Sequence, residues 1–392
     1  MVKTKALILV ACVSILADCG PLGRSERASP DLLEIARGRL GQSVSLVRAG
    51  ATLVAVYSDW ETTGLYSVQI PVADSLPAAA PVAKMIDRID MTLPVSPSFG
   101  EQVALARGST VTVMYLARVG EDKQVLKVAS RDIGAPAWTV DAIEPSGDPL
   151  AILPAENDRL DVFWASGALL HMSYPQNGQP DPLLDRFVPA GRASVFFAAQ
   201  GSPRGMTAYD QASRSLFVLS WNGAGYDRTT VEGGGPVHSS FLLGNGGLVV
   251  LSWDQKTKRL ELLQEKHGEA RASRTLVTLT QDTGSVAVLP SITDSPDTAA
   301  GDSARTAALR ADSLLFLYDE ARPMGAGRSV HELSLLAPGA GWGPAAHRYR
   351  KTVLLSGHEP ISSFSAVEAE GSLYVLVHQG SLKLLRLGLP RQ

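Results

Sequence analysis

Three of the six tryptophans stand where an aromatic ring could bind a ligand. Trp60, Trp221 and Trp253 each follow an apolar run that we predict to be a strand, at the start of a loop. An indole ring in such a position can stack on the face of a sugar or anchor a protein partner. The alternative is that the rings pack between neighbouring structural units, which is the commoner role, and the sequence leaves both open.

The other chemically active residue types form no catalytic or metal-binding pattern. The seven histidines are scattered, and none has the His-x-His, His-x-x-x-His or His-Glu-x-x-His spacing of a zinc site. Asp294, Asp297 and Asp302 lie close together but lack the ligand order of a calcium loop. No Gly-x-Ser-x-Gly nucleophile motif occurs. We therefore predict no catalytic residue, no metal site and no cofactor.

One short motif has the residues of a structural turn. Ser130, Asp132 and Gly134 are followed by Trp138, and the set resembles the Asp-box of sialidase-like propellers, with the tryptophan one residue late. In that family the aspartate caps backbone amides and the tryptophan packs under a hairpin. The resemblance implies a β-propeller fold and no activity, because the Arg-Ile-Pro of sialidases is absent and only Gln69-Ile70-Pro71 stands nearby.

The first residues are typical of an export signal. A basic start is followed by an apolar stretch over residues 6–17, and Leu16-Ala17-Asp18-Cys19 resembles the lipobox of bacterial lipoproteins, apart from Asp18. Cys12 and Cys19 are the only cysteines. The resemblance implies that Cys19 is lipidated and anchors the protein in a bacterial envelope, and Gly20 after it favours the outer membrane. An ordinary cleaved signal, giving a periplasmic or secreted protein, is the alternative.

The elements that must position these residues belong to a repeat, which occurs seven times between residue 43 and the C-terminus. Each copy reads as strand, polar turn, apolar strand, polar loop, strand. The middle strands are rich in β-branched, aromatic and leucine residues, and most are apolar throughout, which indicates burial on both faces. They cover residues 53–57, 111–115, 160–164, 216–220, 248–252, 314–318 and 373–377.

This repeat predicts an all-β fold, a β-propeller of seven four-stranded blades, with six or eight blades as alternatives. One interval is anomalous, because only 32 residues separate the ends of the middle strands at residues 220 and 252. The blade between them is therefore either trimmed or miscounted. A polar insert over residues 290–305 is expected to be a mobile surface loop.

The two ends of the chain suggest how the ring closes. After the last predicted strand only residues 388–392 remain, too few for a fourth strand. We expect residues 31–40 to pair with the last blade and protect its edge, and a short helix capped by Ser29 is the alternative. The chain then divides into a signal peptide (1–18), a tether and closing strand (19–41) and the propeller (42–392).

Composition narrows the function without identifying it. The formal net charge of −3 and the lack of a basic stripe argue against a nucleic-acid partner. We predict a non-catalytic binding or scaffold protein that holds a protein or carbohydrate ligand on its loop face and contacts the membrane through its lipid anchor. The alternative is a carbohydrate-active enzyme, of glycosidase or lyase type, with an axial active site. Carboxylates beside an arginine or tyrosine at the axis would favour the enzyme.

Overall fold

The protein was analysed as a computed structural model, which describes thirteen segments of the chain. They are residues 26–27, 30–88, 99–118, 123–175, 179–197, 204–231, 234–243, 247–265, 272–279, 283–290, 314–325, 328–338 and 349–389. Cys19 and the insert over residues 290–305 lie outside these segments, apart from Pro290 at the end of a strand. The described segments contain no helix that is long and apolar enough to cross a membrane.

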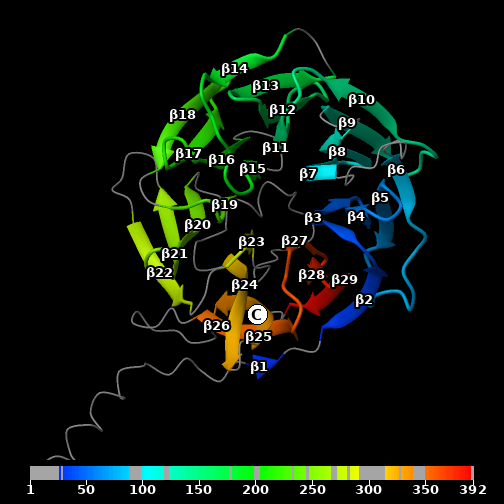
Figure 1. The fold of residues 1–392 in the computed structure, drawn as a ribbon, viewed down its shortest axis with the longest axis vertical. Helices are drawn as coiled ribbons and strands as arrows, with labels where there is room; N and C mark the ends of the chain where they lie inside the picture. The colour runs from blue at the N-terminus through cyan, green and yellow to red at the C-terminus, as the bar shows by residue number, and fades with distance from the viewer. Residues whose placement is uncertain are drawn as a thin grey trace, which may run out of the picture.

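The strands form seven sheets arranged as a ring around a central axis, so the predicted seven-bladed β-propeller is confirmed (Figure 1). We number the blades from the N-terminal side, and each blade runs from its first, innermost strand outwards. Blade 1 contains β3 (Leu40–Ala49), β4 (Thr52–Asp59), β5 (Gly64–Pro71) and β6 (Lys84–Arg88). Blade 2 contains β7 (Phe99–Arg107), β8 (Thr110–Arg118), β9 (Gln124–Asp132) and β10 (Thr139–Ile143).

Blades 3 to 5 have the same antiparallel order. Blade 3 contains β11 (Asp148–Pro154), β12 (Leu160–Ala165), β13 (Leu169–Tyr174) and β14 (Asp181–Leu184). Blade 4 contains β15 (Ser194–Phe197), β16 (Arg204–Asp210), β17 (Ser215–Trp221) and β18 (Tyr226–Val231). Blade 5 contains β19 (His238–Leu242), β20 (Leu248–Asp254), β21 (Arg259–Glu265) and β22 (Ala272–Thr278).

The last two blades each take a strand from the N-terminal segment. Blade 6 contains β23 (Val286–Pro290), β24 (Leu314–Gly325), β25 (Arg328–Pro338) and β26 (Tyr349–Gly357), with β1 (Glu26–Arg27) added in parallel to β26. Blade 7 contains β27 (Ser363–Ala369), β28 (Ser372–Gln379) and β29 (Ser381–Gly388), and its fourth strand is β2 (Asp31–Ala36).

Ring closure by the N-terminal segment is confirmed. Strand β2 runs antiparallel to β29, and Leu33 lies opposite Leu384 in the register. Both leucines are buried in the same cluster between blades 7 and 1. The alternative of a short helix at this position is wrong, because pairing lets the segment cover the edge that the last blade would otherwise leave open. The pairing of β1 with blade 6 was not predicted.

Blade 4 explains the short interval in the repeat. Its apolar run at residues 216–220 belongs to β17, which is the third strand of the sheet and not the second. The true second strand is β16, whose Arg204, Gly205 and Thr207 make it less apolar than its counterparts in other blades. The blade is therefore complete, with β18 as its fourth strand, and the sequence-based assignment was shifted by one strand.

Serine side chains link the first strands of adjacent blades around the axis. Ser365 Oγ of blade 7 accepts from Leu46 N of blade 1 at 3.0 Å, and Ser194 Oγ of blade 4 accepts from Ser240 N of blade 5 at 2.8 Å. Ser239 Oγ of blade 5 accepts from Val288 N of blade 6 at 3.1 Å. The innermost strands have no partner on their axial side, and these hydroxyls satisfy amides that would otherwise be unpaired.

Candidate functional site

The three tryptophans that the sequence singled out do not share one face of the ring. In an antiparallel four-stranded blade, the turn after the second strand lies at the same end as the start of the first strand, and we call this end of the ring the loop face. A hydrogen bond from Trp60 N to Arg39 O (2.8 Å) shows this proximity in blade 1. Trp60 and Trp253 follow second strands and lie on the loop face, whereas Trp221 ends a third strand and lies on the opposite face.

The same tryptophans differ in their accessibility. Trp60 is 38 % exposed, but Trp253 is 3 % exposed and packs in the cluster between blades 5 and 6. Trp221 is partly buried, with the Arg204 guanidinium 4.4 Å from its ring centre and the Tyr226 ring 5.2 Å away. Of these three tryptophans, only Trp60 is exposed on the loop face.

The Asp-box-like residues lie in the hairpin between the third and fourth strands of blade 2. Asp132 Oδ1 accepts a hydrogen bond from Thr110 Oγ1 at 2.5 Å, and Ser130 Oγ lies 3.0 Å from Thr112 Oγ1. Gly134 is in the turn, and Trp138 packs against the core cluster between blades 1 and 2. These contacts hold the second and third strands of one sheet together, at the opposite face from the starts of the first strands.

A charged cluster that the sequence did not suggest lies at the loop-face end of the innermost strands. Glu101 is near the start of β7, Asp148 begins β11, and Arg192 lies two residues before β15. Arg192 donates to Ser43 Oγ at 3.0 Å and to Val44 O at 3.4 Å, and pairs with Glu101 Oε2 at 3.4 Å. We call Ser43, Glu101, Asp148 and Arg192 the axial cluster.

The contacts of Arg192 place the cluster at the axis. Arg192 belongs to blade 4, whereas Ser43 and Glu101 belong to blades 1 and 2. Blades 4 and 1 are not neighbours in a ring of seven, so their contact passes across the centre. The side chains are open to solvent, with 37 % exposure for Arg192 and 53 % for Glu101. Partial burial and the charge of Glu101 raise the pKa of Asp148 above its ordinary value.

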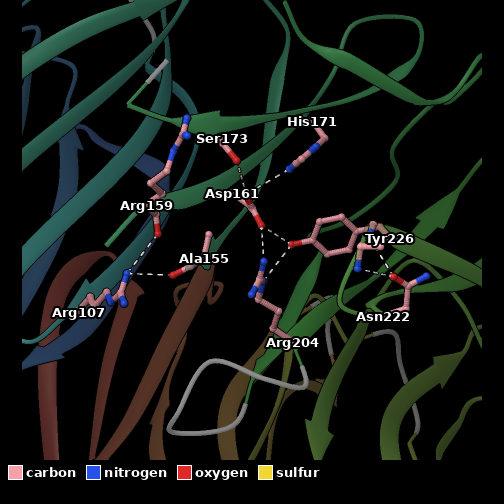
Figure 2. Close-up of polar contacts among 11 residues, drawn as sticks. Arg107, Ala155, Arg159, Asp161, His171, Ser173, Arg204, Asn222 and Tyr226 are labelled. Carbon is pink, nitrogen blue, oxygen red and sulfur yellow. Dashed lines mark hydrogen bonds and ion pairs between the residues drawn. The ribbon is translucent and has the colours of Figure 1, made fainter. Parts of the chain in front are cut away.

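A second polar cluster lies between blades 3 and 4, near the opposite face (Figure 2). Its centre is Asp161 in β12, which is 2 % exposed. Oδ2 of Asp161 accepts from Tyr226 Oη at 2.7 Å and from Arg204 Nη2 at 3.1 Å. Oδ1 accepts from Ser173 Oγ at 2.9 Å and lies 3.3 Å from His171 Nε2. We call these five residues the inter-blade cluster.

The inter-blade cluster is suited to holding two blades together. Burial by itself would raise the pKa of Asp161, but hydrogen bonds from His171, Tyr226 and Ser173 outweigh burial and lower the pKa to about 2. Burial and the Asp161 carboxylate raise the pKa of Tyr226. A carboxylate that is ionised at every physiological pH and accepts from several donors is a poor general base. Its role is therefore structural.

Neither cluster was found from the sequence, for different reasons. Asp161 stands inside the apolar run Leu160-Asp161-Val162, and a charged residue in a buried strand was a signal that could have been followed. Glu101, Asp148 and Arg192 lie far apart in the sequence and meet only because first strands converge at the axis. Within the described segments, no group of three His, Cys, Asp or Glu residues could hold a metal ion.

Comparison with known proteins supports the fold alone. No family model and no curated protein matches this chain. Among solved structures, it is similar to YCF48 bound to D1 peptide, with 10% identity and a TM-score of 0.53 over 93% of this chain and 97% of that chain. It is also similar to streptogramin B lyase, with 7% identity and a TM-score of 0.52 over 91% of this chain and 97% of that chain. At these identities the shared feature is the β-propeller.

Proposed function

We propose that this protein is a non-catalytic binding protein, which holds a protein segment or a carbohydrate on its loop face at the axial cluster. The observation that carries the proposal is the half-exposed set of Glu101, Asp148 and Arg192, presented to solvent where loops of several blades converge. Carboxylates and a guanidinium offer hydrogen bonds and charge to a polar ligand, and Trp60 adds an accessible ring on the same face.

The openness of the cluster favours binding over chemistry. Active sites gain much of their electrostatic effect by excluding water, but Glu101 is 53 % exposed and its charge is screened by solvent. The better enclosed cluster at Asp161 has its carboxylate occupied by protein donors. The charged groups of the axial cluster are therefore accessible to a ligand, whereas the carboxylate of the inter-blade cluster is engaged by residues of the protein.

Binding of purified protein to glycan and peptide arrays tests this proposal. We expect Glu101→Gln and Arg192→Met to weaken capture of the bound class at least tenfold while leaving the fold unchanged by circular dichroism. Asp158→Asn is the matched control, because Asp158 is an almost fully exposed carboxylate in the turn after a first strand, on the opposite face. Equal effects of all three variants, or binding that none of them alters, would contradict the proposal.

One observation favours the alternative of a carbohydrate-active enzyme. Glycosidases use two carboxylates, one of which keeps its proton through a raised pKa, and the pKa of Asp148 is raised partly by Glu101. In that case Asp148 would be the proton donor and Glu101 the base or nucleophile. Hydrolysis or elimination in a broad glycan screen, abolished by Asp148→Asn with binding retained, would establish the enzyme and exclude a purely binding role.

We further propose that the protein is lipidated at Cys19 and anchored in a bacterial outer membrane. Seven residue steps separate Cys19 from Glu26, which pairs with blade 6. A fully extended chain of that length spans about 25 Å. The anchor would therefore keep the rim of blade 6 near the membrane surface and leave the protein little freedom to move away from it.

A further inference from the structure

Within the described residues, the second strand of blade 6 extends farther past its pairing with the first strand than the second strand of any other blade. The last residue of β24 that pairs with the first strand of its blade is Tyr318, and β24 continues for seven more residues, 319–325. In the other six blades the second strand extends at most three residues past that point. Strand β26 supports β25 only as far as His331. Residues 322–325 and 328–330 therefore form a two-stranded projection, which we call the finger; β24 is the long yellow-orange arrow in Figure 1.

The base of the finger is held by a buried charge network. Glu320 and Glu332 lie directly opposite each other in the register, with 5% and 8% exposure. Like charges in that arrangement are destabilising, and here two cations offset them. Arg322 pairs with Glu320 at 2.9 Å and with Glu332 at 3.1 Å, and Lys351 of β26 contacts Glu320. Burial lowers the pKa of Lys351 to about 8, so the amine remains charged at neutral pH.

A buried charge network of this kind contributes little net stability to a sheet. Removing charges from water costs several kcal/mol per ion, and apolar residues of similar volume often stabilise as well or better. Ion pairs do have directional geometry, however, and Arg322 bridges β24 and β25 next to the point where the pairing of β25 with β26 ends. The network thus fixes the orientation of the finger relative to the blade. A fixed orientation is useful to an element that contacts a partner, whereas the core does not require it.

The chemistry of the finger is cationic and apolar. Met324 is 66% exposed, one of the most exposed large apolar side chains of the described residues. Arg328 is exposed, and Arg322 is 43 % exposed. The described finger residues include no acidic side chain. At the axis, by contrast, two carboxylates accompany one arginine.

We propose that the finger is a docking element for a protein partner, which presents an apolar socket rimmed by Asp or Glu residues. This inference rests on the proposed function, since it names the ligand of the loop face as a protein. Met324 fills the socket and Arg328 pairs with its acidic rim. Glu101 and Asp148 lie on the same face, where basic groups of the partner would complement them.

A protein fits the finger better than a lipid surface does. Burial of one methionine side chain and the attraction of two arginines to an anionic membrane each contribute little to the free energy of binding. These contributions are marginal for membrane binding. They are ample as a focal contact within a larger protein interface, where a few central residues supply most of the binding energy.

Site-specific photo-crosslinking in the native cell envelope tests the finger. The full chain carries p-benzoylphenylalanine in place of Met324 or, as the matched control, in place of Lys256, an exposed residue in the equivalent turn of blade 5. We expect position 324 to yield a covalent adduct with one polypeptide, whose crosslinked peptide contains apolar residues beside Asp or Glu. Adding Arg328→Glu should reduce this adduct at least tenfold, and Lys256→Glu should not.

The outcomes separate this inference from the proposed function. No adduct, an adduct with lipid, or the same adduct from position 256 would overturn the finger as a protein-docking element. An adduct that survives Arg328→Glu would overturn the charge argument. If array binding is lost in Glu101→Gln and no finger adduct forms, the axial site stands and the finger inference fails. If no axial variant alters array binding and no finger adduct forms, the proposed function and the finger inference are both contradicted.

Discussion

Asp161 in blade 3 and Arg204 in blade 4 form an ion pair that crosses the boundary between the two blades, with 3.1 Å between Oδ2 and Nη2. Their side chains are 3% and 4% exposed. Tyr226 donates to the same carboxylate oxygen, and the Arg204 guanidinium stacks on Trp221. The two blades are thus joined by a buried charge pair in addition to an apolar cluster of the kind that also fills other blade boundaries.

Removal of one partner of this pair should be strongly destabilising. Asp161→Asn leaves the Arg204 charge buried without its counter-ion, which typically costs about 3 to 5 kcal/mol of unfolding free energy. Urea unfolding followed by tryptophan fluorescence measures the loss. Asp158→Asn, which breaks the exposed pair with Arg107, should leave stability nearly unchanged. A similar midpoint for both variants would contradict a structural role for the inter-blade cluster.

The same carboxylate predicts a specific acid sensitivity. The pKa of Asp161 falls from 3.8 to about 2 on folding, so the unfolded chain binds the proton more readily. Its contribution, about 2 kcal/mol, is present above pH 4 and is lost as the pH falls through about 2. Unfolding of wild type and Asp161→Asn at pH 5 and pH 2.5 should show a smaller pH-dependent loss in the variant. An equal loss in both would show that other carboxylates account for the acid sensitivity.

The contribution of the closing strand β2 to stability can be tested by comparing two adjacent leucines, one buried and one exposed. Leu33 is 4% exposed in the cluster between blades 7 and 1, whereas its neighbour Leu32 points outwards and is 52% exposed. Leu33→Ala should lower the free energy of unfolding by about 2 to 3 kcal/mol, and Leu32→Ala should change it by less than about 0.5 kcal/mol. If the two variants unfold alike, β2 does not contribute its inner face to the ring.

The fold was predictable because its signal is local and repeated. Runs such as residues 53–57 and 373–377 each contain enough β-branched and leucine residues to indicate a buried strand, and seven copies indicate a ring. The shift in blade 4 came from the same reliance on apolar runs. Ala208-Tyr209-Asp210 of β16 resembles Leu317-Tyr318-Asp319 of β24, the second strand in blade 6, and that match would have identified β16.

The site was harder to predict because its residues are brought together only by the ring. Arg192 and Ser43 are 149 positions apart and touch across the axis. No spacing rule covers such a pair, since it depends on the number of blades and on the loop that enters blade 4. Trp221 was misplaced for a different reason. Its residue type suggested ligand binding, but it ends a third strand and not a second strand, so it lies on the opposite face.

Trp60 and Trp253 should separate ligand binding from stability. Trp253 is buried between blades 5 and 6, so Trp253→Ala should destabilise the protein by about 3 to 5 kcal/mol. Trp60 is partly exposed on the loop face, and Trp60→Ala should reduce capture on the arrays and destabilise the protein much less than Trp253→Ala does. Thermal unfolding and array binding of the two variants check this. Unaltered capture in Trp60→Ala would remove this ring from the binding surface.

The proposed membrane anchor depends on the sulfur atom of Cys19. If Cys19 is lipidated, mass spectrometry of the mature N-terminus should find an acylated cysteine as its first residue, and the protein should fractionate with outer membranes. Cys19→Ser should move the protein to the soluble envelope fraction, because each buried CH₂ of an acyl chain contributes about 0.8 kcal/mol to membrane binding. Cys12→Ser is the control and should leave the protein anchored. An unmodified N-terminus at any other residue would show that the chain is exported by an ordinary signal and that blade 6 is not tethered to a membrane.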